Sequence, residues 1–79
     1  MQQTLGLTTY QLNFIRALCS GIHTDFGSKE VNVQFPLGTK SNIARIKSAL
    51  TEKELIEERI DGTYLSDIIF EMWFIREFM

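Results

Sequence analysis

The first regular pattern in the chain is a run of apolar residues at helical spacing. Four of them recur three or four residues apart: Ile15, Leu18, Cys19 and Ile22. That spacing places side chains on one face of an α-helix. Thr8 and Gln11 precede the run with the T-x-x-Q pattern of a capping box. The pattern predicts a helix over residues 9–20 that Gly21 ends.

Residues 28–35 fit two different structures. Val31, Val33 and Phe35 alternate as they would in a strand, whereas Ser28 is a suitable N-cap for a short helix. Pro36 disfavours helical geometry at Phe35, and Gly38 supplies a permissive backbone. A tight turn is therefore expected at residues 35–38, whichever element precedes it.

A second helical pattern begins at Thr39, which is a good N-cap residue. Its predicted inner face is an apolar stripe of Ile43, Ile46, Ala49 and Leu50. Its predicted solvent face is basic and rich in hydroxyl groups: Lys40, Ser41, Arg45, Lys47 and Ser48. This is the clearest amphipathic helix in the chain.

The last third of the sequence predicts a hairpin and a final helix. Asp61-Gly62 separates two short β-compatible runs, residues 55–60 and 63–65, which is a strong hairpin signal. Asp67 can cap a helix over residues 68–78 that is apolar almost all round. A helix this short with no polar face has to bury both sides, so one side is expected to meet something outside this chain.

Length and composition limit the architecture to one small domain. The chain has 79 residues, of which 44% are hydrophobic, enough for one core and too few for two. We expect this domain to span residues 8–79, after a flexible lead-in or linker stump at residues 1–7. The single cysteine, Cys19, cannot form a disulfide framework.

Charge is distributed unevenly along the chain. The overall formal charge is −2, but residues 39–53 contain four basic residues and one acidic residue, a net charge of +3. Residues 54–61 contain one basic and four acidic residues, a net charge of −3. The sequence has neither the pattern of a signal peptide nor an apolar span of membrane length, so a cytoplasmic protein without membrane contact is expected.

The segment Gly38-Thr39-Lys40-Ser41 resembles part of a phosphate-binding loop. A Walker A motif requires glycine directly before the lysine and again five residues earlier. Thr39 and Gln34 occupy those positions. The sequence therefore predicts neither a nucleotide site nor any other cofactor.

The same segment suits a helix-turn-helix, in which a glycine-containing turn leads into a recognition helix. A hairpin directly after that helix would make the motif winged. Seven residues are then candidates for DNA contact: Lys40, Ser41, Asn42, Arg45, Lys47, Ser48 and, on the wing, Arg59. An ordinary solvated face is an equally acceptable explanation of these charges, and the acidic wing residues Glu57, Glu58 and Asp61 weaken the DNA interpretation.

Two other groups of residues have a candidate chemistry. Cys19 and His23 are four residues apart and could share a helix face as metal ligands, but two further ligands are not evident. A buried thiol beside a surface histidine is expected instead, and no pairing of carboxylates or nucleophiles predicts catalysis. A set of aromatic residues in the last helix is expected to be core plus docking surface: Phe70, Trp73, Phe74 and Phe78.

Three runs in order carry a family resemblance: LGTKSNIARIKSALTEKELIE, RIDGTYLSD and DIIFEMWFIREF. Together they resemble the C-terminal winged-helix domain of prokaryotic AAA-type P-loop ATPases, a group abundant in Bacteroidetes and archaea. The positions that match are Leu37-Gly38-Thr39, Asn42, Leu50, Leu55-Ile56, Asp67, Phe70 and Trp73. Ile68 stands where that family usually has proline.

The resemblance implies a mainly α fold with a small β-hairpin, that is, a winged helix-turn-helix with a three-helix core, a two-stranded wing and an additional C-terminal helix. It also implies that residues 28–35 form the short second helix, and that the chain is a fragment or stand-alone relative of an ATPase. Two functions follow. One is an accessory module that binds double-stranded DNA, and the other is a module that docks on a P-loop ATPase domain or on its own copy without binding DNA.

Overall fold

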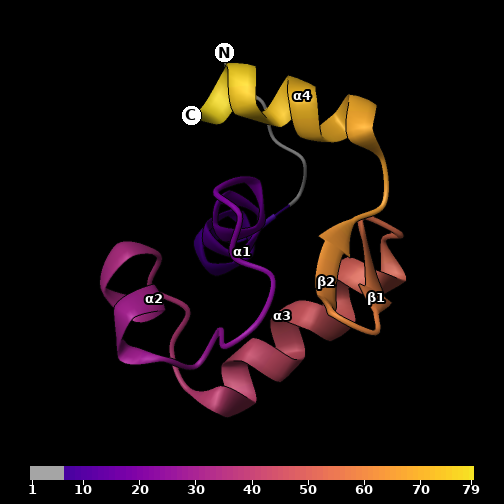
Figure 1. Cartoon of the computed structure of the whole chain (residues 1–79). Helices are drawn as coiled ribbons and strands as arrows, with labels where there is room; N and C mark the ends of the chain where they lie inside the picture. The colour runs from indigo at the N-terminus through magenta and orange to yellow at the C-terminus, as the bar shows by residue number, and fades with distance from the viewer. Residues whose placement is uncertain (1–6) are drawn as a thin grey trace.

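The computed structural model describes residues 7–79, which form four helices and one two-stranded antiparallel sheet (Figure 1). In chain order the elements are α1 (Thr9–Cys19), α2 (Lys29–Gln34), α3 (Lys40–Glu52), β1 (Ile56–Arg59), β2 (Gly62–Leu65) and α4 (Ile68–Phe78). The predicted mainly helical fold with a small hairpin is confirmed. The predicted lead-in lies outside the described residues except for Leu7, which is half-buried against the core.

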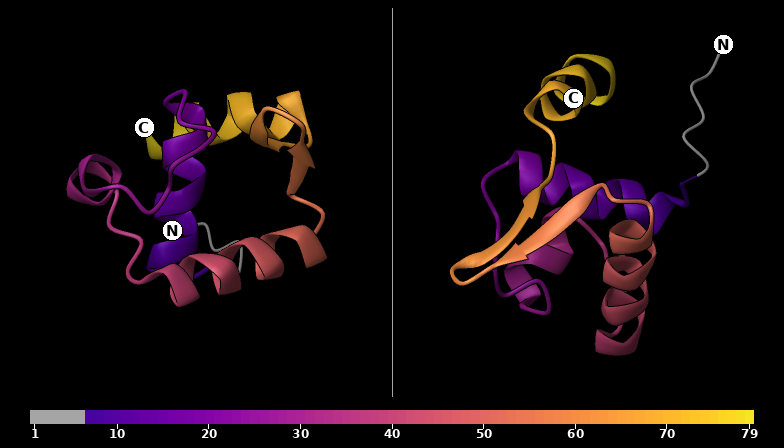
Figure 2. Two further views of the ribbon diagram at one scale, coloured as in Figure 1. Left: turned by 60° about the horizontal axis from the view of Figure 1, so that its bottom comes forward. Right: turned by 90° about the vertical axis from the view of Figure 1, so that its right-hand side faces the viewer.

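Helix α1 is the centre of the domain. Figures 1 and 2 show it between α3 on one side and α4 on the other, with the hairpin closing a third side. Phe14, Ile15 and Leu18 are almost completely buried there. Both hydrogen bonds of the predicted capping box are present, at 3.0 and 3.2 Å. The helix ends one residue earlier than predicted, at Cys19.

Residues 29–34 are helical, so the strand alternative for this segment is wrong. The Ser28 hydroxyl caps α2 by accepting a hydrogen bond from the Val31 backbone N–H at 3.3 Å. Val31 is buried, but Val33 is 80% exposed. A strand alternation would have buried both valines, whereas two residues of helix rotate the side chain by about 200° and place them on different faces.

The turn between α2 and α3 is organised around Leu37, whose side chain has no exposed surface. Its backbone N–H donates to the Asn32 side-chain oxygen at 3.0 Å, and its carbonyl accepts from the Asn42 amide at 2.7 Å. Gly38 follows with φ +85°, and a Cβ there would lie 2.9 Å from that amide nitrogen. The turn therefore requires glycine for both conformation and space.

The hairpin differs from its prediction by one residue. Arg59 pairs with Gly62, so the loop is Ile60-Asp61 and the glycine belongs to β2. The reason lies outside the hairpin: the Thr63 N–H donates to the His23 carbonyl at 2.9 Å, and a Cβ on Gly62 would lie 2.7 Å from that same oxygen. Because the chain after α1 approaches β2 this closely, position 62 has no room for a side chain and requires glycine.

Helix α4 begins at the predicted cap, where the Asp67 carboxylate accepts from the Ile69 N–H at 2.9 Å. Its aromatic residues face the interior. Phe74 is fully buried, and Phe70, Trp73 and Phe78 are half-buried against the same core. Among residues 7–79, no helix combines the length and apolar character needed to cross a membrane.

The central place of Leu37 gives a stability prediction. Replacing Leu37 with alanine leaves a cavity at the α2–α3 turn and should lower the free energy of unfolding by about 2–5 kcal/mol. Urea denaturation followed by circular dichroism measures this. Ile60→Ala is the matched control, because Ile60 is fully exposed at the hairpin loop and its loss should change stability by about 0.5 kcal/mol or less. Equal effects of the two changes would contradict the role of Leu37.

Candidate nucleic-acid interface

The exposed face of α3 contains four of the seven predicted DNA contacts: Lys40, Ser41, Arg45 and Ser48. Ser41, Arg45 and Ser48 are four and three residues apart, so they form one stripe along the helix. Ile43, Ile46 and Leu50 occupy the opposite face and are buried. The predicted separation of an apolar inner face from a basic, hydroxyl-rich outer face is therefore confirmed for these residues.

The start of α3 is electropositive for two reasons. Its first turn contains no acidic residue, so nothing there neutralises the positive end of the helix dipole. Lys40 and Arg45 add full positive charges close to that end. A shallow depression of about 280 Å³ lies beside it, lined by Tyr10, Gly38, Thr39, Ser41, Asn42 and Arg45. An anion such as a phosphate group would meet backbone N–H groups, hydroxyls and a guanidinium there.

Asn42 has a different role from the predicted one. Its side-chain amide donates to the Leu37 carbonyl, and its backbone N–H donates to the Thr39 hydroxyl at 3.2 Å. The side chain is half-buried. In this conformation Asn42 fixes the turn, and its amide does not extend from the outer face of α3.

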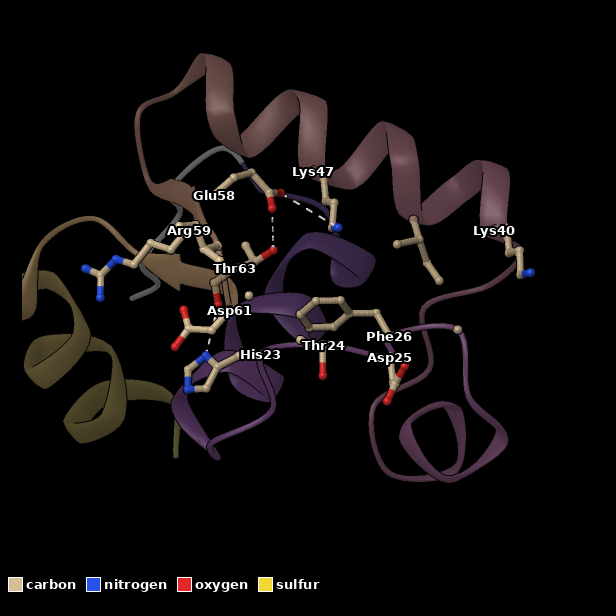
Figure 3. A pocket seen from close by; sticks show the side chains of 14 residues that line it. His23, Thr24, Asp25, Phe26, Lys40, Lys47, Glu58, Arg59, Asp61 and Thr63 are labelled. Atoms are coloured by element: carbon tan, nitrogen blue, oxygen red, sulfur yellow. Dashed lines mark hydrogen bonds and ion pairs between the residues drawn. The ribbon is translucent and has the colours of Figure 1, made fainter.

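Lys47 also lies apart from the exposed stripe. Figure 3 shows it directed into a groove between α3 and the hairpin, where its ammonium lies 3.7 Å from a Glu58 carboxylate oxygen. The same nitrogen lies 5.3 Å from the centre of the Phe26 ring, within range of a cation–π interaction. The expectation that Lys47 points freely to solvent is wrong, because the hairpin supplies a partner that the sequence pattern did not reveal.

The groove that holds Lys47 has a volume of about 460 Å³ and is open to solvent. It is lined by basic residues and by an equal number of acidic ones, with His23 at its edge: Lys40, Lys47, Arg59, Asp25, Glu58 and Asp61 (Figure 3). Glu58 also accepts a hydrogen bond from the buried Thr63 hydroxyl at 3.1 Å. Because the charges balance, this groove offers a polyanion no net electrostatic attraction.

Arg59, the predicted contact on the hairpin, is held by neighbours on its own sheet. Its guanidinium pairs with Glu57 and lies 4.4 Å from the centre of the Tyr64 ring. Tyr64 in turn donates a hydrogen bond to Asp61 at 3.0 Å, which raises the pKa of its phenol. The cation of the hairpin is therefore paired within the hairpin, which also contains the carboxylates of Glu58 and Asp61 and remains acidic.

Cys19 and His23 do not converge on a shared metal site. The His23 ring nitrogen Nδ1 lies 2.9 Å from the Thr63 carbonyl, and the ring stacks on Tyr64 with centroids 4.1 Å apart. The sequence predicted a surface histidine, but His23 is half-buried. Within residues 7–79, no cluster of three or more His, Cys, Asp or Glu residues is placed to hold a metal ion.

Two features of the surface were missed by sequence reasoning. One is Tyr10, whose position beside the start of α3 depends on how α1 packs. The other is which residues form the outward side of the last helix, a side that the sequence did lead us to expect: Ile68, Ile69, Met72 and Ile75 on α4, and Met79 at its C-cap. The periodicity of these residues was a usable signal, but the neighbouring aromatic residues obscured it.

Comparison of the chain with family models, curated proteins and solved structures gave no match in any of the three.

The environment of Cys19 gives a prediction about its reactivity. Burial of the thiol, and after it the negative charge of Glu71, raises the pKa of Cys19 to about 11. Since the thiolate is the nucleophile, alkylation by iodoacetamide at pH 8 should be at least about tenfold slower in the folded chain than in urea. The folded thiol holds its proton more tightly than the unfolded one. The contribution of the protonated Cys19 thiol to the free energy of unfolding is therefore complete below pH 9. It declines as the pH rises from there toward about 11.

Glu71→Gln is the control for this prediction. It removes the second cause and leaves burial in place, so alkylation should become moderately faster without reaching the unfolded rate. A folded chain that reacts as fast as the unfolded one would show that the thiol is not protected.

Proposed function

We propose that the chain is a winged helix-turn-helix module that binds double-stranded DNA through the outer face of α3. Helices α2 and α3 with the Leu37 turn correspond to the helix-turn-helix, and the hairpin β1–β2 corresponds to the wing. The observation that carries the proposal is the exposed stripe on α3. Its hydroxyl groups and Arg45 lie with Lys40 at a helix start without acidic residues, and neither basic side chain forms an ion pair with any of residues 7–79.

The arrangement of charge supports binding that is modest and sensitive to salt. Lys40 and Arg45 are the exposed cations on the contact face, while Lys47 and Arg59 have acidic neighbours in the folded chain. Each phosphate contact contributes about 0.9 to the slope of log affinity against log salt concentration. Two or three contacts would give a slope of roughly −2 to −3, far less than that of a strongly basic DNA-binding protein.

The same module would act as an accessory domain if it belongs to an AAA-type ATPase, as the resemblance of about residues 8–78 implies. In that setting weak DNA binding is sufficient, because tethering to a larger assembly raises the effective concentration. This part of the proposal rests on analogy between sequences. An upstream Walker A motif in the full open reading frame would support it.

A second candidate function is protein docking without DNA contact. One observation favours it: α4 exposes four large aliphatic side chains, and its C-cap residue Met79 a fifth, while its aromatic residues are packed inward. An apolar face of this kind on a small domain marks an interaction surface. The two functions use opposite sides of the molecule, since α3 and α4 lie on either side of α1 (Figure 1), so they are compatible with each other.

The DNA proposal predicts salt-dependent binding that needs Arg45. Fluorescence anisotropy with labelled duplex DNA should detect binding at low salt that weakens at physiological salt. Arg45→Ala should reduce the binding free energy by about 1–3 kcal/mol, the value for one charge-assisted contact. Lys53→Ala is the matched control, because Lys53 lies at the other end of the same helix and its loss removes an equal charge. No binding even at low salt would reject the DNA function.

Releasing Lys47 from its partner should strengthen DNA binding. Glu58→Gln removes the carboxylate 3.7 Å from the Lys47 ammonium but keeps an oxygen to accept from Thr63. Affinity at low salt should rise by roughly two- to tenfold, since one cation is freed and one repulsive charge is lost. The same anisotropy titration measures it. Unchanged affinity would mean that the groove beside the hairpin lies outside the contact area.

A further inference from the structure

The aliphatic face of α4 has the spacing of a coiled-coil seam. Its exposed residues Ile68, Met72, Ile75 and Met79 are four, three and four residues apart. They are 65%, 62%, 41% and 56% exposed, respectively. Alternating steps of four and three correspond to successive d and a positions of a heptad. The seam therefore matches the surface that one helix presents to a second, parallel or antiparallel, helix.

The polar residues beside the seam distinguish these two orientations. With Ile68 at d, Glu71 occupies a g position and Arg76 occupies the e position five residues later. In a parallel pair of identical helices, a g residue of one copy faces the following e residue of the other. Glu71 of each copy would then face Arg76 of its partner, which makes two opposite-charge pairs by symmetry.

An antiparallel pair lacks this match. It places e positions opposite e positions and g positions opposite g positions, so Arg76 would meet Ile69 or another Arg76. Glu71 would meet Phe78 or another Glu71. Neither combination joins opposite charges, and a like-charge contact costs free energy.

We propose that the chain forms a parallel homodimer through α4, in which Ile68, Met72, Ile75 and Met79 each pack against the same residue of a second copy. Glu71 pairs across the interface with Arg76. Among residues 7–79, the one ion pair of Arg76 is a 3.7 Å contact with the adjacent Glu77, and its side chain is 75% exposed. Arg76 can therefore form an ion pair with Glu71 of a second copy.

The shape of the domain accommodates this arrangement. The other helices and the hairpin lie on one side of α4, as Figure 1 and the right view of Figure 2 show. A two-fold axis parallel to α4 therefore leaves the two bodies on opposite sides of the helix pair. Both α3 faces stay uncovered on the outside of the dimer, so the dimer is independent of the proposed DNA function.

The seam is short, which sets its expected strength. An 11-residue helix is about 16 Å long, and a stable dimer usually buries about 800 Å² on each partner. We therefore expect a concentration-dependent dimer. Its dissociation constant should lie between about 1 μM and 1 mM.

Sedimentation equilibrium across that concentration range tests for the dimer. Met72→Glu should weaken it by at least roughly tenfold, because two carboxylates would meet at the symmetry axis. Ile60→Glu makes the same kind of change at a fully exposed isoleucine of the hairpin loop and should leave association unchanged. A chain that is monomeric at about 1 mM, or a dimer insensitive to Met72→Glu, would overturn the proposal, even if α4 then bound an ATPase domain.

The orientation is tested by charge exchange and by cross-linking. Glu71→Arg and Arg76→Glu should each weaken the dimer by roughly 2- to 30-fold, and the double variant should restore it. In a Cys19→Ser background, Met72→Cys should form an intermolecular disulfide under mild oxidation, since equivalent residues face each other in a parallel pair. Ile60→Cys should not. No restoration in the double variant, or no faster cross-linking at position 72 than at position 60, would reject the parallel orientation.

DNA titration of Met72→Glu separates this inference from the proposed function. The variant should lose association and keep the intrinsic affinity of each domain for DNA. If wild type fails to bind DNA but dimerises, only the DNA function is rejected. If it binds DNA but remains monomeric at the highest concentration, only the dimer is rejected.

Discussion

The position of α3 depends on how one buried residue, Leu37, is held between two helices. Its side chain fills the core, so its backbone polar groups are removed from water and need partners. The Asn32 and Asn42 side chains supply them, one from each flanking helix. A third asparagine, Asn13 on α1, donates to the neighbouring Pro36 carbonyl at 2.9 Å. The turn is thus fastened to α1, α2 and α3 together, and the direction of α3 follows from it.

With α3 fixed in this direction, its residues have different structural roles. Ile43, Ile46 and Leu50 attach the helix to the core, Asn42 secures its start, and Lys47 holds the hairpin through Glu58. Only the remaining stripe is free to meet another molecule. The charge that this stripe offers is therefore smaller than the +3 of residues 39–53, which is why we expect DNA binding to be weak.

Helix α4 shows a similar division between two apolar faces. Aromatic rings fill the space over α1, with Phe74 stacked on Phe78 at a centroid distance of 4.6 Å. The outer face has aliphatic side chains in a regular seam flanked by charges of opposite sign. Large flat rings suit an irregular core, whereas isoleucine and methionine at heptad spacing suit a helix pair. A domain of 79 residues has a small core, so burial of this second face would also add stability.

The sequence by itself determined the elements that depend on local interactions. The Thr8–Gln11 capping box, the Thr39 and Asp67 caps and the periodicity of residues 43–50 act within a few residues, so spacing alone located three helices. Tertiary contacts decided the remainder. Residues 29–34 became a helix because, of the two valines, only Val31 has a place in the core, and the hairpin loop moved by one residue because His23 approaches Gly62. Packing likewise decided which basic and apolar side chains stay exposed. Glu58 on the hairpin contacts Lys47 on α3, and α1 covers one face of α4. No local sequence pattern encodes these contacts, because each joins two separate elements.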